Sequence, residues 1–148
     1  MSTSIRERIL QAVMVRLQPV AQAFGAGLYR SPVIALTRAQ CPALVVFPES
    51  EVIKERNNTL VTRELLIRVV ALARESPPDP PEILVDRLIT AAHAAFFMPD
   101  TTLGGLALAV HEVGSEWDIE DADATAVSMV SKYLVTYRTA RDDLTFSP

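Results

Sequence analysis

The chain opens on apolar residues at the spacing of an amphipathic helix, over residues 4–18. Ser4 and Glu7 are placed to form a capping box, in which hydroxyl and carboxylate satisfy backbone N–H groups that a helix leaves free. Pro19 cannot donate a backbone hydrogen bond, so the pattern predicts either a kink there or a second short helical piece through Phe24. The apolar positions are Ile5, Ile9, Ala12, Val13 and Leu17.

Two extended segments follow, residues 28–36 and 43–47. The second is a continuous apolar run bounded by Pro42 and Pro48, which is typical of a strand buried on both faces. Residues 49–58 are polar and charged, and predict either a mobile loop or the tip of a long hairpin.

Residues 59–74 fit two periodicities. At period two, one face is nearly all apolar, with Arg63 as its exception; at period 3.6, a helical stripe is also present. We favour a strand, because the alternation is strong and the segment begins without a helix cap. The apolar alternate positions are Val61, Leu65, Ile67, Val69, Ala71 and Ala73, and the helical stripe would be Leu65, Leu66, Val69, Leu72 and Ala73.

A second helix is predicted after a proline-rich turn, with Asp79 as N-cap, Pro80 in the first helical position and Glu82 completing the box. Its apolar face would hold Leu84, Leu88, Ala91, Ala92, Ala95 and Phe96, and its polar face Glu82, Asp86, Thr90 and His93. The last third predicts a hairpin. One strand runs over 104–113, the acidic stretch 116–123 turns the chain, and 125–139 returns, before a frayed tail over 141–148.

The order of elements predicts one α+β domain spanning residues 1–148, with a mostly antiparallel, mixed sheet of about four to five strands and two helices packed on one face. Two helices can cover only one face of such a sheet. The second face nevertheless carries six apolar residues, which indicates an interaction surface unless segment 49–58 folds back over it. These residues are Leu60, Leu66, Val70, Leu72, Val130 and Leu134.

Composition narrows the class of protein. The chain has 148 residues, 49% hydrophobic and 22% charged, which suffices for a core without disulfides and excludes general disorder. A net charge of −4 and a pI near 5.2 argue against binding of polyanions. No signal peptide is visible, and no apolar stretch reaches the roughly 18 residues of a membrane span. The single cysteine, Cys41, predicts a reduced, intracellular thiol.

Candidate chemistry is sparse, and no catalytic, cofactor-binding or metal-binding residue is assigned. His93 and His111 lack metal-ligand spacing, and neither Gly25-Ala26-Gly27 nor Gly104-Gly105 fits a nucleotide-binding loop. An acidic cluster fails the calcium-loop pattern, because Asp123 stands where that loop needs glycine. We expect a solvated hairpin end, with a weak divalent-cation site at subunit contacts or repulsion of a passing polyanion as alternatives. The cluster comprises Glu112, Glu116, Asp118, Glu120, Asp121 and Asp123.

Several segments together carry a family resemblance over nearly the whole chain. They are the helix opening 5–10, the run 41–47 followed by acidic 49–51, the strand ending 68–71, the helix 84–95, the segment 102–106 and the closing strand 133–139. In their order along the chain and their pattern of apolar and polar residues, these segments resemble the tail terminator proteins of long-tailed bacteriophages, the minor tail protein U type. More loosely, they resemble other small neck and connector proteins.

The resemblance implies a structural virion protein rather than an enzyme. Such proteins form a hexameric ring at the head-proximal end of the tail tube, stop its polymerisation and offer a surface for head joining, after assembly in the host cytoplasm. Expected partners are further copies of the chain, the tail tube protein and head-tail connector or neck proteins, without a membrane or specific nucleic-acid binding. The six apolar residues would form the subunit or tube interface, and Glu116, Asp118, Glu120, Asp121 and Asp123 would line a lumen that DNA crosses. The alternatives are another head-tail connector or tail-completion protein and, more remotely, a small enzyme that uses His93, His111 or the acidic cluster.

Overall fold

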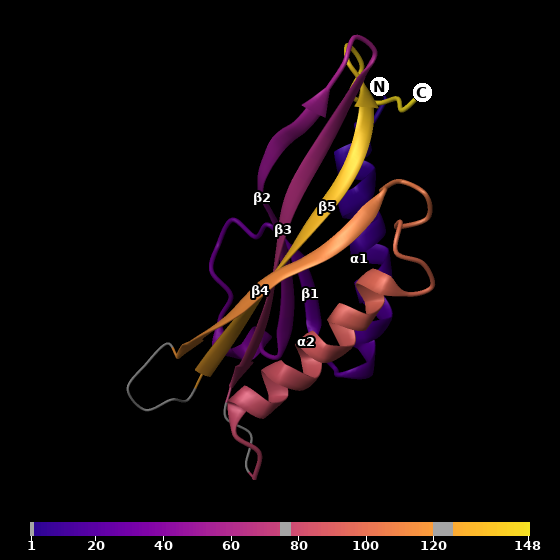
Figure 1. The fold of residues 1–148 in the computed structure, drawn as a ribbon. Helices are drawn as coiled ribbons and strands as arrows, with labels where there is room; N and C mark the ends of the chain where they lie inside the picture. Colours follow the sequence, from indigo (N-terminus) through magenta and orange to yellow (C-terminus); the bar gives the residue numbers. More distant parts are fainter. Residues whose placement is uncertain (1, 75–77, 120–125) are drawn as a thin grey trace.

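A five-stranded sheet with two helices on one face forms the domain (Figure 1). The computed structural model describes residues 2–74, 78–119 and 126–148. Strand order is β1-β2-β3-β5-β4; β1 runs parallel to β2, and every other neighbouring pair is antiparallel. The predicted α+β class and order of elements are confirmed. The elements are α1 (Ile5–Ala23), β1 (Gly27–Arg30), η1 (Arg38–Gln40), β2 (Ala43–Arg56), β3 (Leu60–Arg74), α2 (Pro81–Phe97), β4 (Ala109–Ile119) and β5 (Ala126–Ala140).

Helix α1 begins as its sequence predicts, because the Ser4 hydroxyl accepts a hydrogen bond from the Glu7 N–H at 3.2 Å. A separate helical piece after Pro19 is not present, since one helix continues through Pro19 to Ala23. Proline deprives the carbonyl of Val15 of its helical partner. Val15 is 72% exposed, so water can take that place at little cost.

The hairpin interpretation of residues 49–58 is the correct one. Strand β2 extends to Arg56 and pairs with β3 as far as Val61, with shifts in register after Pro48 and after Ile53. At the turn, the Asn57 side-chain oxygen accepts from the backbone N–H groups of Thr59 and Leu60 at 2.8 and 2.7 Å. Because residues 49–58 form this hairpin, they do not fold back over the second face of the sheet.

The alternation in β3 decides which side of the sheet becomes the core. Its odd-numbered apolar residues are buried against both helices, together with Ile9 and Leu17 of α1 and Phe96 of α2. Full burial of each such side chain stabilises the fold by roughly 1.5–3 kcal/mol. We call this side the helix-covered face. The opposite side, which carries the even-numbered residues of β3, is the open face.

Helix α2 begins one residue later than predicted. Pro80 is the N-cap residue and makes no side-chain capping bond, so Asp79 is not the cap; its carboxylate instead lies 3.4 Å from the Arg87 guanidinium. The apolar stripe is also rotated relative to the prediction. Val85 and Ile89 are buried, which the predicted face omits, whereas Ala91 and Ala95 are only half-buried.

Strand β4 is displaced along the chain from its predicted range. Residues 101–106 form turns, with Leu103, Gly104 and Gly105 all at positive φ, a region that glycine enters without steric cost. The strand starts at Ala109 and runs through Glu116 and Asp118 to Ile119, so the predicted turn does not begin at Glu116. Its bonds go to β5, which satisfies the backbone of these acidic residues.

The last eight residues, for which we expect fraying, make backbone contacts with the domain. The N–H of Ile5 donates to the carbonyl of Leu144 at 2.9 Å, and the N–H of Ala140 donates to that of Phe146 at 2.7 Å. Arg8 also donates to the carbonyl of Thr145. These bonds tie the segment to the start of α1 and the end of β5. Over the residues that the structure describes, neither helix is long and apolar enough to cross a bilayer.

Candidate interaction surfaces

Five of the six apolar residues predicted for the second face lie close together on the open face. Leu66 on β3 is the register partner of Leu134 on β5, and Val70 is that of Val130. Leu72 continues the β3 side of this group. All five side chains are half-buried, so each retains surface that a partner can cover. We call Leu66, Val70, Leu72, Val130 and Leu134 the apolar patch.

Leu60 does not belong to this patch. It lies at the hairpin end of β3, about 20 Å from Leu66 at the usual rise of a strand. Thr62 and Glu64 stand between them on the same face. Leu60 lines shallow pockets beside the turn and the C-terminal segment instead.

A charged row divides the apolar patch. Arg68 and Lys132 are register partners between the Leu66 and Val70 rows. The Arg68 guanidinium carbon lies 4.6 Å from the centroid of the Phe47 ring, a cation–π geometry, and Lys132 pairs with Glu49 at 3.2 Å. The open face therefore combines apolar contact area with two cations that neighbouring side chains hold in place.

Of the five acids predicted for the lumen, the structure places two. Glu116 is the partner of Val130 and Asp118 the partner of Ser128, so both lie on the open face at its β4 edge, and both are exposed. Glu120, Asp121 and Asp123 lie outside the described residues. Glu112 points to the other face, where it is the register partner of Tyr133.

Glu51 forms the centre of a polar cluster on the helix-covered face. Its carboxylate lies 2.9 Å from the Arg6 guanidinium and 3.5 Å from that of Arg63, and it accepts a hydrogen bond from the Tyr137 hydroxyl. Burial is the main cause that raises the pKa of Tyr137, and the bond to Glu51 adds to it. The cluster joins α1, β2, β3 and β5, which indicates a structural role.

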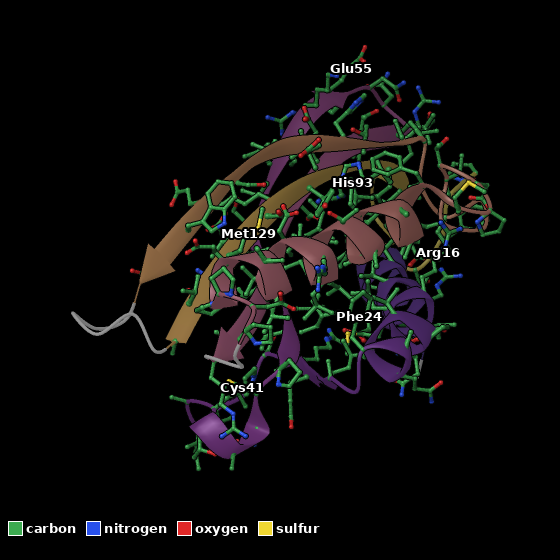
Figure 2. The ribbon with its side chains drawn as sticks, turned by 90° about the horizontal axis from the view of Figure 1, so that it is seen from below. Arg16, Phe24, Cys41, Glu55, His93 and Met129 are labelled. Carbon is green, nitrogen blue, oxygen red and sulfur yellow. The ribbon has the colours of Figure 1, made fainter. Side chains whose placement is uncertain are left out.

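The two histidines lie on opposite faces of the sheet. His93, predicted on the polar face of its helix, turns towards the sheet, where its Nδ1 lies 2.9 Å from the Tyr133 hydroxyl (Figure 2). Burial raises the pKa of Tyr133, with a smaller contribution from Glu112. His111 is the partner of Leu134 on the open face. Within the described ranges, no three His, Cys, Asp or Glu side chains gather in a way that could hold a metal ion.

Arg16 on α1 holds the C-terminal end of α2 (Figure 2). Its guanidinium donates to the carbonyls of Phe96 and Asp100 at 3.2 and 2.8 Å, and lies 3.2 Å from the Asp100 carboxylate. Hydrogen bonds from the Gly104 and Thr102 N–H groups, more than Arg16, lower the pKa of Asp100. A cation at this end of a helix is favoured by the helix dipole.

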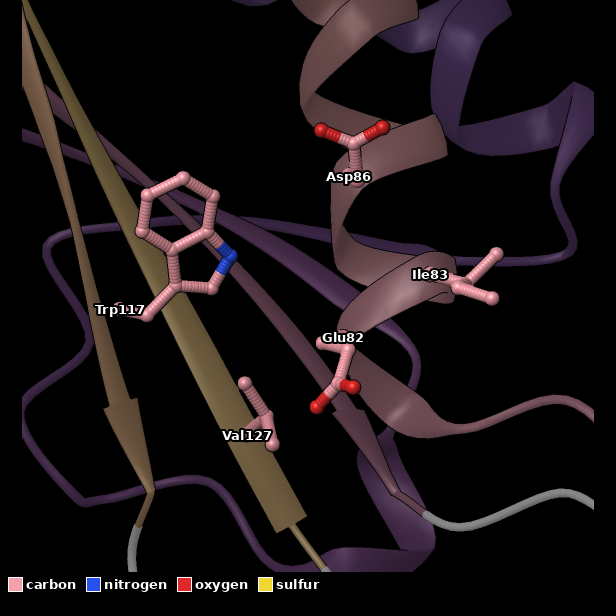
Figure 3. A pocket seen from close by; sticks show the side chains of 5 residues that line it. All are labelled: Glu82, Ile83, Asp86, Trp117 and Val127. Atoms are coloured by element: carbon pink, nitrogen blue, oxygen red, sulfur yellow. The ribbon is translucent and has the colours of Figure 1, made fainter.

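Sequence reasoning missed a pocket of about 460 Å³ between α2 and the sheet. Figure 3 shows the Trp117 indole turned towards α2, across the pocket from Glu82 and Asp86. Ile83 and Val127 complete the lining; we call this the Trp117 pocket. The i, i+4 spacing of the two acids was visible in the sequence, but the apposition of β4 was not. A second cavity, of about 320 Å³, has the half-buried Cys41 in its lining beside Phe24 and Leu84.

Comparisons with known proteins give a likeness to solved structures. No family model matches the chain, and no curated protein matches it. A solved structure, the sheath/tube terminator of the extracellular contractile injection system PVC in its extended state, is similar over 93% of this chain. Sequence identity is 10%, the TM-score is 0.40, and the match spans 60% of that chain. At this level the likeness assigns no function to the present chain.

Proposed function

We propose that this protein is a tail terminator: a structural virion subunit that caps the head-proximal end of a tail tube as a ring, stops tube polymerisation and provides a surface for head joining. The observation that carries the proposal is the apolar patch. Two helices cover one face of the sheet, and Leu66–Leu134 and Val70–Val130 stand in register on the other. Exposed apolar patches of this kind mark surfaces that bind a partner protein.

The resemblance to the minor tail protein U type supplies the identity of that partner. It implies a hexameric ring of identical copies, seated on the tube protein and followed by connector or neck proteins. A ring of identical chains requires a heterologous contact, in which two different surfaces of each copy meet. The apolar patch on the open face would supply one of these two surfaces. Assembly would take place in the host cytoplasm before the ring joins the virion.

We also propose that Glu116 and Asp118 face the channel of the ring. Both are exposed on β4, and like charge along a channel keeps DNA from adhering during its passage. Glu120, Asp121 and Asp123 extend the same acidic sequence. An assembled ring in which β4 points away from the axis would overturn this part of the proposal.

A different neck protein, such as a connector or tail-completion factor, is the second candidate of the same class. It would use the same apolar patch. The particle that accumulates when the gene is deleted distinguishes it from a terminator. Loss of a terminator leaves tubes of uncontrolled length, whereas loss of a completion factor leaves tubes of normal length without heads. For a small enzyme, His93 and His111 offer separate environments on opposite faces rather than one site.

Electron microscopy of the full chain mixed with the polymerising tube protein of the same particle tests the proposal. We expect tubes of limited length with a ring on one end. A Leu66→Glu variant should leave the tubes uncapped, and Val15→Glu, a charge introduced at an exposed site on α1, should not. Tubes of unregulated length without terminal rings, in the presence of the wild-type chain, would overturn the proposal.

A further inference from the structure

We propose that the Trp117 pocket receives the tip of the β2–β3 hairpin of a second copy of this chain, with Lys54 and Arg56 seated against Glu82, Asp86 and the Trp117 ring. We define the hairpin tip as residues 52–60. The inference deepens the proposed function by naming the contact between neighbouring subunits, and it rests on that function for the closure of the ring.

The pocket has the chemistry of a receptor for a cationic side chain. Glu82 and Asp86 lie one turn apart on α2, both exposed, and within the described part of the chain neither carboxylate has an ion-pair partner. The Trp117 ring opposite them is 56% exposed. Tryptophan is the aromatic side chain that attracts a cation most strongly, and two carboxylates add to this attraction.

The hairpin tip offers the complementary groups. Lys54 and Arg56 are exposed and, over the residues that the structure describes, form no ion pair. The register shifts between Ile53 and Glu55, so Lys54 has no partner residue on β3 and stands out from the ladder. Val52 and Ile53 are 58% and 47% exposed, which provides apolar area to match Trp117 and Ile83.

The edge of β2 is also available at this tip. Strand β1 pairs with Ala43–Val46, and among the described residues no strand pairs with β2 on that side from Pro48 onwards. An unpaired edge ordinarily invites a partner chain. Exposed apolar residues with flanking cations at such an edge indicate a segment that is covered in the assembled state.

The two surfaces cannot meet within one copy. Val127 in the pocket is the register partner of Ala73, and the hairpin turn begins beyond Leu60, which places the length of β3, about 40 Å, between them. Figure 1 shows the hairpin tip and the start of α2 at opposite ends of the domain. A contact between unlike ends of identical chains is heterologous, and it closes into a ring when the rotation permits.

Charge exchange in the full-length protein tests the contact. Variant A carries Lys54→Glu and Arg56→Glu, and variant B carries Glu82→Lys and Asp86→Lys. We expect each alone to self-associate at least about tenfold more weakly than the wild type, because like charges then face each other. An equal mixture should recover association, since the acidic hairpin of A fits the basic pocket of B and the reverse pair is native. Sedimentation velocity measures this. The fluorescence of Trp117, the only tryptophan, should shift to shorter wavelength as the pocket fills.

Disulfide trapping gives a readout that does not depend on ring size. In a Cys41→Ala background, Lys54→Cys with Asp86→Cys should yield intermolecular disulfides on oxidation, and Lys54→Cys with Val15→Cys should not.

Wild-type self-association that A and B retain unchanged, or a wild-type chain that stays monomeric and yields no specific disulfide, overturns the inference. Tube-end microscopy separates the two proposals. If variant A alone and variant B alone still form rings that cap tubes, only this contact is overturned, whereas tubes left uncapped by the wild type overturn the proposed function.

Discussion

The hydroxyl of Tyr137 on β5 donates a hydrogen bond to the carboxylate of Glu51 on β2, across the intervening strand β3. Arg6 of α1 pairs with the same carboxylate at 2.9 Å. Glu51 directly precedes the hairpin tip on β2, so the bond fixes the base of the segment that we propose to contact a neighbour. We expect loss of this bond to lower the free energy of unfolding and to change the position of the hairpin.

Tyr137→Phe should lower the free energy of unfolding by about 1–2 kcal/mol at neutral pH, because a bond to a charged acceptor is lost while the ring stays packed. Urea unfolding followed by circular dichroism measures this. Tyr29→Phe is the matched control at a half-buried position, and we expect its effect to stay within about 0.5 kcal/mol. Equal losses in both variants would contradict the role assigned to the Glu51 bond.

The same bond predicts a dependence of stability on alkaline pH. Burial raises the pKa of Tyr137 and of Tyr133 above the ordinary value. A group whose pKa is raised on folding keeps its proton longer in the folded state, so its contribution is complete below about pH 10 and is lost as the pH rises above it. Unfolding free energies should therefore fall above that pH, and less steeply in Tyr137→Phe. A slope unchanged by the substitution would contradict this assignment.

Arg16→Met should lower the unfolding free energy by about 2–3 kcal/mol, because the Phe96 carbonyl at the end of α2 and both the carbonyl and the carboxylate of Asp100 lose a charged donor in a half-buried site. Thermal and urea unfolding measure the change. Arg87→Met serves as control: its exposed pair with Asp79 at 3.4 Å should contribute no more than about 0.5 kcal/mol. Similar effects of the two substitutions would show that Arg16 does not cap the helix.

Asp100→Asn should make the protein less sensitive to acid. Hydrogen bonds from Gly104, Thr102 and then Arg16 lower the pKa of Asp100. A carboxyl whose pKa is lowered on folding stabilises the protein above its unfolded pKa of about 3.9, and that contribution is lost as the pH falls. Between about pH 5 and pH 2, the wild type should therefore lose stability more steeply than Asp100→Asn. Parallel acid unfolding curves would contradict the prediction.

Leu134→Glu should separate folding from assembly. The side chain is half-buried on the open face, so we expect a loss of about 1 kcal/mol in unfolding free energy and an intact fold. Capping of tubes should be abolished, because the apolar patch would then meet its partner with an unpaired charge. Circular dichroism and tube-length distributions measure the two effects. A variant that folds and still caps would show that the patch is not the contact surface.

Local pattern was sufficient for much of the fold. The Ser4 hydroxyl caps α1 as expected, whereas the Glu7 carboxylate, which the box would also use, pairs with Arg30 instead. The alternation in residues 59–74 correctly indicated a strand with one buried face. That alternation also identified part of the apolar patch, because apolar residues on the second face of a strand can be recognised from the sequence of that strand alone. Such features depend on residues close in sequence, whose preference for water or core is set by composition and period alone.

Polar segments were harder to interpret, for a physical reason. Residues 49–56 form a strand whose side chains are mostly exposed on both sides, so no apolar period marks it. Pro48 of β2 is tolerated because β1 ends its pairing at Val46, so that among the described residues no strand pairs with Pro48 on that side. The start of α2 was misplaced similarly, since Asp79, Pro80 and Pro81 all suit a helix terminus and only packing selects between them.

Apolar periodicity in the sequence was enough to identify both helices and the strands that have a buried face. Which distant residues meet depends on how the elements pack together. Trp117 faces Glu82 and Asp86 because the register of β4 on β5 carries the indole to the first turns of α2. Glu51 meets Arg6 and Tyr137 because β3 brings β2 and β5 together. Strand order and register follow from the joint packing of all elements, and no local pattern encodes them.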